Sequence, residues 1–402
     1  MKITKIETIR IKKRQNLLWV KVHTDEGIVG LGETWFGTGP AEADIHERIA
    51  GLILGEDPSK IEMLNRKMRP YVGFYGTSAE IRACSAVDVA LWDIAGKVSG
   101  KPVCALLGGK TRENIKVYNT CAGPDYISET SDVKPDNFGL DSNVAYQGRI
   151  YQDLDGFLHR ADEVAAELLE MGIDSMKIWP FDFTQGAVDG VDISVADLKK
   201  AVEPFEKIRK AHGDKMKIKA ELHGLWSVPA AKKIISALAP IGMDWIEDPI
   251  WMDRISDIRE IVDYTDQPIS GGESLGGLGQ MRELLELGRI SVPIIDVTWG
   301  GGITFSKKSA ALAESFGKSI AFHDCSGPVT LAASTHLALA CPTVSEQEIT
   351  RAFYYGWYHE ITETAPPIEN GFITVPDAPG HGVSLREDFT KRDDATLRIT
   401  EI

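Results

Sequence analysis

From residue 114 onward, short apolar runs rich in β-branched residues alternate with stretches that have the spacing of amphipathic helices. This alternation predicts parallel strands joined by crossover helices. Eight strand candidates favour a closed TIM-like (β/α)7β barrel of the α/β class, although an open doubly wound sheet has the same periodicity. The expected strands are residues 115–120, 175–179, 217–222, 244–248, 268–273, 293–297, 319–323 and 343–348. The expected helices are residues 155–171, 195–211, 229–238, 255–264, 278–287, 305–316 and 329–340.

Residues 1–113 have a different pattern and predict a small α+β domain that caps the barrel. Strands are expected at residues 2–12 and 17–24, and helices at 41–54, 58–68 and 78–98. The barrel is expected over residues 114–356, with a long insertion at 124–152 after its first strand. Residues 357–402 are turn-rich with short strands, so we expect them to return to the capping domain.

The chain is acidic, with a formal net charge of −15 and a sequence pI of about 5.1. This charge repels a phosphate backbone, so we expect no nucleic-acid partner. The five cysteines form no CxxC pair and are odd in number, which argues against a disulfide framework or a zinc site and favours the cytoplasm. The first residues predict a strand rather than a signal peptide, and no apolar run is long enough to span a membrane.

Three glutamates stand at the ends of neighbouring predicted strands. Glu221, Glu247 and Glu273 follow one another at equal steps of 26 residues, about one strand-plus-helix unit. In a barrel they would meet at the C-terminal mouth, where three close carboxylates repel one another. A hard divalent cation removes that repulsion, and oxygen ligands favour Mg²⁺ over zinc. The alternative is that each glutamate is a solvated loop residue.

Two histidines and a lysine add proton chemistry to this carboxylate set. His323 ends one predicted strand and Asp296 the preceding one, so the carboxylate can orient the imidazole and raise its basicity. His223 lies two residues after Glu221, a spacing that puts both on one face of a strand. Lys177 lies inside an apolar run, where a lysine is costly unless it is paired or functional. Alternatively, the histidines are surface or packing residues, and Lys177 pairs with Glu273 or Asp296 only to balance charge.

With these motifs the sequence resembles the enolase superfamily, specifically its mandelate racemase subgroup. The resemblance covers nearly the whole chain, through SAVDVALWDIAGKVSGKPVCALLGG in the capping domain and MKIW, AELHG, WIEDP, GGES, DVTWGGGIT and AFHDCSGP in the barrel. It implies that the three glutamates are the Mg²⁺ ligands and that His323 and Asp296 are the general-base pair. Lys177 falls on the first lysine of the family's lysine-x-lysine motif, and Glu348 on the acidic residue that hydrogen-bonds the substrate carboxylate.

Three differences from the racemase motifs bear on the reaction. Trp179 occupies the position of the motif's second lysine, and an indole cannot take a proton, so a two-base racemase is not expected. Glu221 stands where the family more often has Asp. The Glu-x-His of residues 221–223 is similar to the Asp-x-His of galactonate and mannonate dehydratases, which implies that His223 protonates a leaving hydroxyl.

We therefore expect a lyase: a Mg²⁺-dependent acid-sugar dehydratase that removes the proton α to a carboxylate and yields a 2-keto-3-deoxy acid. Its partner is a small carboxylate substrate, and the resemblance favours a homo-oligomer. The aromatic residues Trp19, Trp35, Tyr75 and Trp179 are expected to contact substrate; packing of the cap on the barrel is the alternative. A lactone cycloisomerase, a one-base epimerase and a non-enzymatic sugar-binding barrel stay open.

Overall fold

The computed structural model describes residues 1–402 apart from 72–75, 131, 141–144 and 147–148. Its centre is a barrel of eight parallel strands, each hydrogen-bonded to the next, with the last strand pairing with the first. The α/β barrel predicted from the alternating pattern is therefore confirmed, and the open sheet is wrong. The strands are β4 (Ile115–Thr120), β7 (Ser175–Ile178), β8 (Lys217–Glu221), β9 (Trp245–Glu247), β10 (Ile269–Gly271), β11 (Val292–Ile295), β12 (Ile320–Phe322) and β13 (Val344–Ile349).

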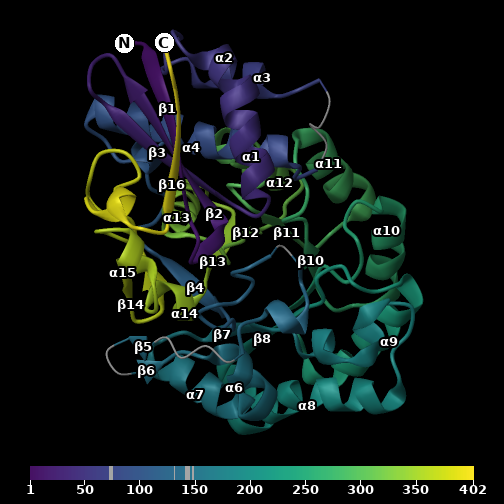
Figure 1. Ribbon diagram of the computed structural model, residues 1–402. Helices are drawn as coiled ribbons and strands as arrows, with labels where there is room; N and C mark the ends of the chain where they lie inside the picture. The colour runs from purple at the N-terminus through teal and green to yellow at the C-terminus, as the bar shows by residue number, and fades with distance from the viewer. Residues whose placement is uncertain (72–75, 131, 141–144, 147–148) are drawn as a thin grey trace.

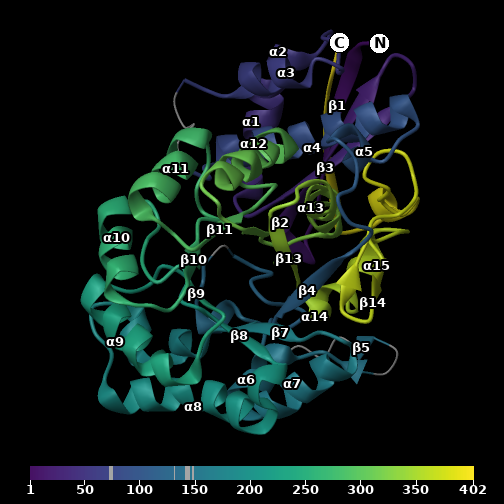
Figure 2. The same ribbon diagram turned by 180° about the vertical axis from the view of Figure 1, so that it is seen from behind.

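Crossover helices surround the strands (Figures 1 and 2), and their apolar residues join the buried core. The helix expected at 155–171 is broken at Arg160, whose φ of −139° is not helical. The helix expected at 278–287 continues beyond Glu283 as a π-helical turn, Leu284–Gly288. The helices are α6 (Asp153–His159), α7 (Ala161–Glu170), α8 (Val195–His212), α9 (Val228–Leu238), α10 (Ile255–Tyr264), α11 (Leu278–Glu283), α12 (Gly302–Ser315) and α13 (Pro328–Ala340).

The N-terminal domain is an antiparallel sheet with helices on one face. Its strands are β1 (Ile3–Ile11), β2 (Arg14–Thr24) and β3 (Val29–Trp35). Its helices are α1 (Thr38–Asp44), α2 (Ala50–Ile53), α3 (Ile61–Met68), α4 (Ala79–Ser99) and α5 (Val103–Leu106), with a π-helical turn, Ile45–Ile49, between α1 and α2.

Helix α4 is the long element that joins this domain to the barrel. Ser78 caps its N-terminus, and Gly100 ends it in a left-handed conformation. Gly30 and Gly32 of β3 let the helix approach closely, because a Cβ there would lie within 2.1 Å of an α4 carbonyl oxygen. The indole of Trp92 donates to Thr304 of α12 at 2.9 Å, so the cap is held against the barrel.

The C-terminal segment returns to the first domain. After α14 (Arg351–Tyr354) and α15 (Tyr358–Ile361), the hairpin of β14 (Ile368–Glu369) and β15 (Phe372–Ile373) pairs with β4. The last strand, β16 (Ala395–Glu401), then pairs antiparallel with β1, so the two chain ends lie side by side (Figure 1).

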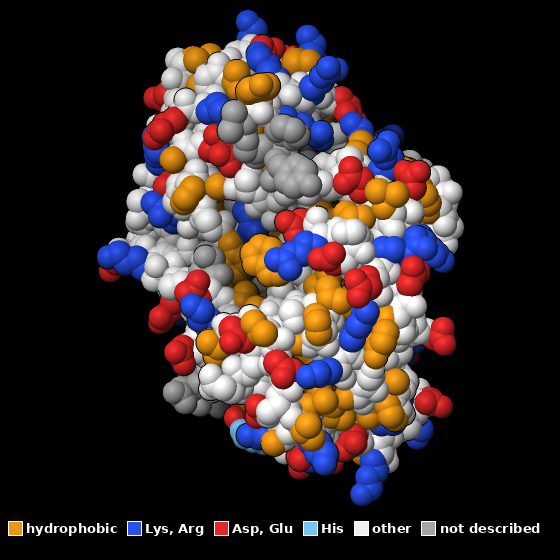
Figure 3. Space-filling model, turned by 90° about the vertical axis from the view of Figure 1, so that its right-hand side faces the viewer, with side chains coloured by type: hydrophobic (Ala, Val, Ile, Leu, Met, Phe, Trp, Pro, Cys, Tyr) orange, Lys and Arg blue, Asp and Glu red, His pale blue; other side chains and the backbone are white. Residues whose placement is uncertain are grey.

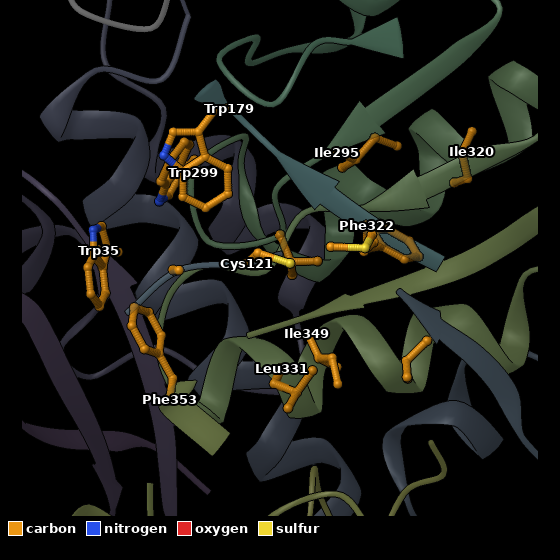
Figure 4. Close-up of a cluster of buried hydrophobic side chains, with 14 of the residues drawn as sticks. Trp35, Cys121, Trp179, Ile295, Trp299, Ile320, Phe322, Leu331, Ile349 and Phe353 are labelled. Carbon is orange, nitrogen blue, oxygen red and sulfur yellow. The ribbon is translucent and has the colours of Figure 1, made fainter. Parts of the chain in front are cut away.

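The buried core continues from the barrel to the cap. In Figure 4, Trp35 from the cap faces Phe353 from the barrel side, with stacked rings 5.9 Å apart. Among the residues that the structure describes, no helix is both long and apolar enough to cross a membrane.

Candidate active site

The three glutamates predicted at strand ends meet at one rim of the barrel. Glu221 and Glu247 are the last residues of β8 and β9, and Glu273 follows β10 by two residues. One carboxylate oxygen from each lies within 4.8 Å of the others. The C-terminal ends of parallel barrel strands share one rim, so the equal spacing in sequence becomes a cluster in space.

The electrostatics of this cluster fit a hard cation. Burial raises the pKa of Glu247 and of Glu273, and neighbouring glutamates raise both further. Glu273 is partly exposed, but its Oε2 atom is buried and accepts no hydrogen bond from any residue in the described ranges. The donor set consists only of carboxylate oxygens, which suits Mg²⁺.

Lys177 on β7 reaches into the same cluster. Its Nζ lies 2.7 Å from Glu247, 3.2 Å from Glu221 and 2.9 Å from Glu348. These carboxylates raise the pKa of Lys177 well above its ordinary value, although burial alone would lower it. The suggested charge partners Glu273 and Asp296 are wrong, since the ammonium group pairs with the three other carboxylates.

Glu348 lies on β13 beside Lys177. Besides the lysine, it accepts hydrogen bonds from the Thr120 hydroxyl and from the Asp324 backbone N–H at 3.0 Å. Burial alone would raise the pKa of Glu348, but Lys177 and His323 hold it below its ordinary value, so the carboxylate is ionised. As an ionised group, Glu348 orients the ammonium group of Lys177 and does not donate a proton.

His323 and Asp296 form the expected pair on adjacent strands. Both follow strand residues that pair directly in the sheet, Phe322 and Ile295. His323 Nδ1 lies 2.7 Å from Asp296 Oδ2, while Nε2 lies 3.5 Å from a Glu273 oxygen. Because the other Asp296 oxygen accepts two backbone N–H bonds after β11, its carboxylate is fixed. The imidazole therefore presents Nε2 to the cluster.

His223 enters the site from a turn rather than from a strand face. Strand β8 ends at Glu221, and His223 adopts a φ of +49°, which non-glycine residues rarely adopt. Its Nδ1 lies 2.7 Å from Asp182, and its Nε2 lies 3.4 Å from the Tyr126 hydroxyl. Burial lowers the pKa of His223, but the carboxylates of Asp182 and Glu221 raise it to about 9. The imidazole is thus protonated at neutral pH.

These groups open into one cavity of about 430 Å³ between the barrel mouth and the cap. Figure 3 shows the molecule hollowed there, with hydrophobic side chains in the recess. The cavity wall combines the polar cluster with an apolar outer part from both domains. Its lining includes Trp35, Arg82, Thr120, Tyr126, Lys177, Trp179, Glu221, His223, Trp251, Glu273, Trp299, His323 and Glu348.

The expected aromatic contacts divide into three groups. Trp35 and Trp179 line the cavity, as a substrate contact requires. Trp19 does not, which corrects that expectation: it is fully buried on β2, its indole donates to Glu33 at 2.7 Å, and its ring packs on Phe389. The strand expected at 17–24 begins at Arg14, so Trp19 lies inside β2, where its side chain joins the buried cluster between cap and barrel. Tyr75 lies outside the described residues.

Several residues that line the cavity or support it from behind were not predicted from the sequence. Asp182 follows β7 by four residues, Thr120 ends β4, and Arg82 lies on α4 with its guanidinium 4.4 Å from the Trp299 ring centre. Asp248 directly follows Glu247 and accepts a hydrogen bond from Gly272 N–H. A position at the end of a barrel strand or within four residues after it is the one signal that could have found Asp182, Thr120 and Asp248.

Comparisons with known proteins agree with this geometry. Residues 160–389 match the family described as enolase C-terminal domain-like, and residues 5–108 match the mandelate racemase / muconate lactonizing enzyme N-terminal domain. The chain belongs to the enolase superfamily, in its mandelate racemase subgroup. It is therefore an enzyme, and its relatives support the hydro-lyase type.

Individual relatives cover almost the whole chain. A D-galactonate dehydratase of Ralstonia pickettii (strain 12J) is 31% identical over 395 residues, which cover 96% of this chain and 93% of the relative. The crystal structure of a mandelate racemase subgroup enolase from Agrobacterium tumefaciens has a TM-score of 0.87 at 42% identity and covers 100% of this chain and 99% of its own. A putative dehydratase from Zymomonas mobilis ZM4 has a TM-score of 0.85 at 27% identity, with 100% of both chains covered.

Proposed function

We propose that this enolase superfamily member is a Mg²⁺-dependent acid-sugar dehydratase that converts a 2,3-dihydroxy acid into a 2-keto-3-deoxy acid. The observation that carries the proposal is the presence of two imidazoles of different character in one cavity with the carboxylate cluster. His323 has Nε2 beside that cluster, and His223 is held as a proton donor by Asp182. A base and an acid are the two groups that elimination of water requires.

In this proposal Lys177 provides the positive charge that binds the substrate carboxylate. His323 Nε2 takes the proton from C2, and the C–H electron pair moves into the carboxylate to give an enediolate. In a second step this electron pair returns to form the C2=C3 double bond as the C3–O bond breaks. His223 gives its proton to the departing hydroxyl, which leaves as water. The enol then takes up a proton at C3 and becomes the 2-keto acid.

Glu221, Glu247 and Glu273 are the residues that would hold the metal. When bound, Mg²⁺ would supply a Lewis acid for the substrate carboxylate and a positive charge that favours the neutral, basic form of His323.

The test is a panel of acid sugars that includes D-galactonate, the substrate in the name of the Ralstonia relative. We expect 2-keto acid to form with Mg²⁺, detected with semicarbazide, and to disappear with a chelator. In D₂O, His323→Asn should abolish exchange of the C2 proton, whereas His159→Asn, at an exposed histidine, should not. Turnover of a lactone without formation of keto acid would favour a cycloisomerase. Inversion of the configuration at C2 without loss of water would favour a one-base epimerase. Binding without any exchange would leave a sugar-binding barrel.

A further inference from the structure

A second Asp–His pair lies at the cavity, and its aspartate contacts the histidine without lining the cavity itself. Asp182 sits in the short 3₁₀ turn Pro180–Phe183 that follows β7. Its Oδ2 lies 2.7 Å from His223 Nδ1, and its side chain is 1% exposed, against 17% for His223. The histidine thus reaches the cavity, and the aspartate supports it from behind.

The turn that carries Asp182 is held rigidly. Phe181 is fully buried and stacks on Phe205 of α8, with ring centres 5.9 Å apart. The Thr184 hydroxyl donates to the Phe181 carbonyl at 2.7 Å. The packing of Phe181 and this hydrogen bond hold the turn, and thereby the direction of the Asp182 carboxylate.

The contact with His223 is the main interaction of the Asp182 carboxylate. Its Oδ1 accepts no hydrogen bond within the described ranges, and Oδ2 bonds only to His223. A buried carboxylate with one unsatisfied oxygen costs free energy rather than supplying it. His223 itself adopts a left-handed backbone, a second local cost. Both costs are explained if the pair serves the reaction.

The contact fixes which imidazole nitrogen faces the cavity. An ionised carboxylate only accepts hydrogen bonds, so His223 must donate Nδ1–H to Asp182. Nε2 is then the remaining nitrogen, and it lies on the side of Tyr126, which also lines the cavity. A ring turned by 180° about its Cβ–Cγ bond would put the wrong atom toward the substrate.

We propose that Asp182 is the positioning residue for His223: it holds the ring so that Nε2 delivers the proton to the departing C3 hydroxyl. This role rests on the proposed dehydration. In the step, the Nε2–H bond breaks, the C3–O bond breaks, and the hydroxyl leaves as water, while Asp182 keeps the Nδ1 proton in place. Asp182 does not touch the substrate.

The first experiment measures two partial reactions of the Mg²⁺-loaded enzyme on the acid sugar that the panel identifies. Asp182→Ala should lower keto-acid formation about 10²-fold or more, the size of a general-acid contribution. Exchange of the C2 proton, which depends on His323, should stay within about threefold by the same reasoning. Asp182→Asn can still accept the Nδ1 bond and should fall between wild type and the alanine variant. The matched control is Asp189→Asn, an exposed residue of the same loop, which should behave as wild type.

A double-mutant cycle separates positioning from an independent role. His223→Gln and the double variant Asp182→Ala/His223→Gln should form keto acid at the same rate, because Asp182 acts only through His223. A substrate analogue with fluorine in place of the C3 hydroxyl releases fluoride, which needs no donated proton, so all these variants should process it about as fast as wild type. Loss of fluoride release, or a double variant tenfold slower than His223→Gln, would overturn the proposal.

A readout that needs no substrate keeps the two proposals distinguishable. In ¹⁵N-labelled wild type, we expect the His223 Nδ1 proton to give a downfield NMR signal, assigned by its absence in His223→Gln. Asp182→Ala should remove this signal. If the signal persists unchanged, Asp182 does not hold the ring, and the inference fails whatever the enzyme turns over. If the signal behaves as expected but no acid sugar yields a keto acid, the dehydratase proposal fails instead.

Discussion

Three carboxylates, two of them buried and the third partly exposed, meet at the barrel rim, so we expect Mg²⁺ to stabilise the folded protein measurably. Their nearest oxygens lie within 4.8 Å of one another. At this separation and an effective dielectric constant of about 20, each pair repels by about 3.5 kcal/mol. Lys177 contacts only Glu221 and Glu247 of the three, so the repulsion that involves Glu273 is relieved least.

The free energy of Mg²⁺ binding to the folded state predicts how far Tm rises. At a free Mg²⁺ concentration of about 100 times the dissociation constant, binding to the folded state adds about 2.7 kcal/mol. For a chain of 402 residues, with an unfolding entropy of about 2.1 cal/mol/K per residue, this raises Tm by about 3 °C. The assay is calorimetry of chelator-treated protein titrated with MgCl₂, with KCl at equal ionic strength as the blank.

Glu273→Gln provides the sharpest comparison, because it removes a ligand and a repelling charge together. Without metal the variant should melt at or above the wild-type temperature, and with saturating Mg²⁺ it should melt below wild type. Glu314→Gln, at an exposed residue of α12, should keep the full Mg²⁺ response. Equal responses of wild type and Glu273→Gln would refute the assignment of this cluster as the metal site.

Three further outcomes are expected. Trp19→Phe leaves a Glu33 oxygen without its donor and should cost about 1–3 kcal/mol in urea unfolding, with KM unchanged; a raised KM would restore Trp19 to the substrate site. Burial lowers the pKa of His336 to about 3, so the unfolded chain binds its proton first as pH falls below 6.5. Stability lost between pH 7 and 5 should therefore be about 2 kcal/mol smaller in His336→Gln, and identical pH profiles would contradict this. Lys177→Met should destabilise the metal-free protein by about 3–5 kcal/mol, and a loss below about 1 kcal/mol in urea would contradict the buried ion cluster.

The local pattern of the sequence was enough to predict the barrel and most of the site residues at its C-terminal rim. Strand and helix periods repeat along the chain, and residues that follow a strand must lie at the same end of a parallel barrel. Glu221, Glu247 and Glu273 could therefore be placed together from their spacing alone, and Asp296 beside His323 from strand order. Lys177 could be singled out from the apolar run around it, and the family resemblance added Glu348; both lie on barrel strands.

The tertiary structure decided what depends on side-chain direction and on contacts between distant segments. Asp182 and His223 are 41 residues apart and meet only because a packed turn and a left-handed residue face each other. Trp19 has the same aromatic chemistry as Trp35 and belongs to the same buried cluster, but its ring packs on Phe389 and its indole bonds to Glu33 instead of lining the cavity. Periodicity determines which elements form and at which end their loops gather. It carries no information on where an irregular loop points, because that is set by packing against residues far away in the chain.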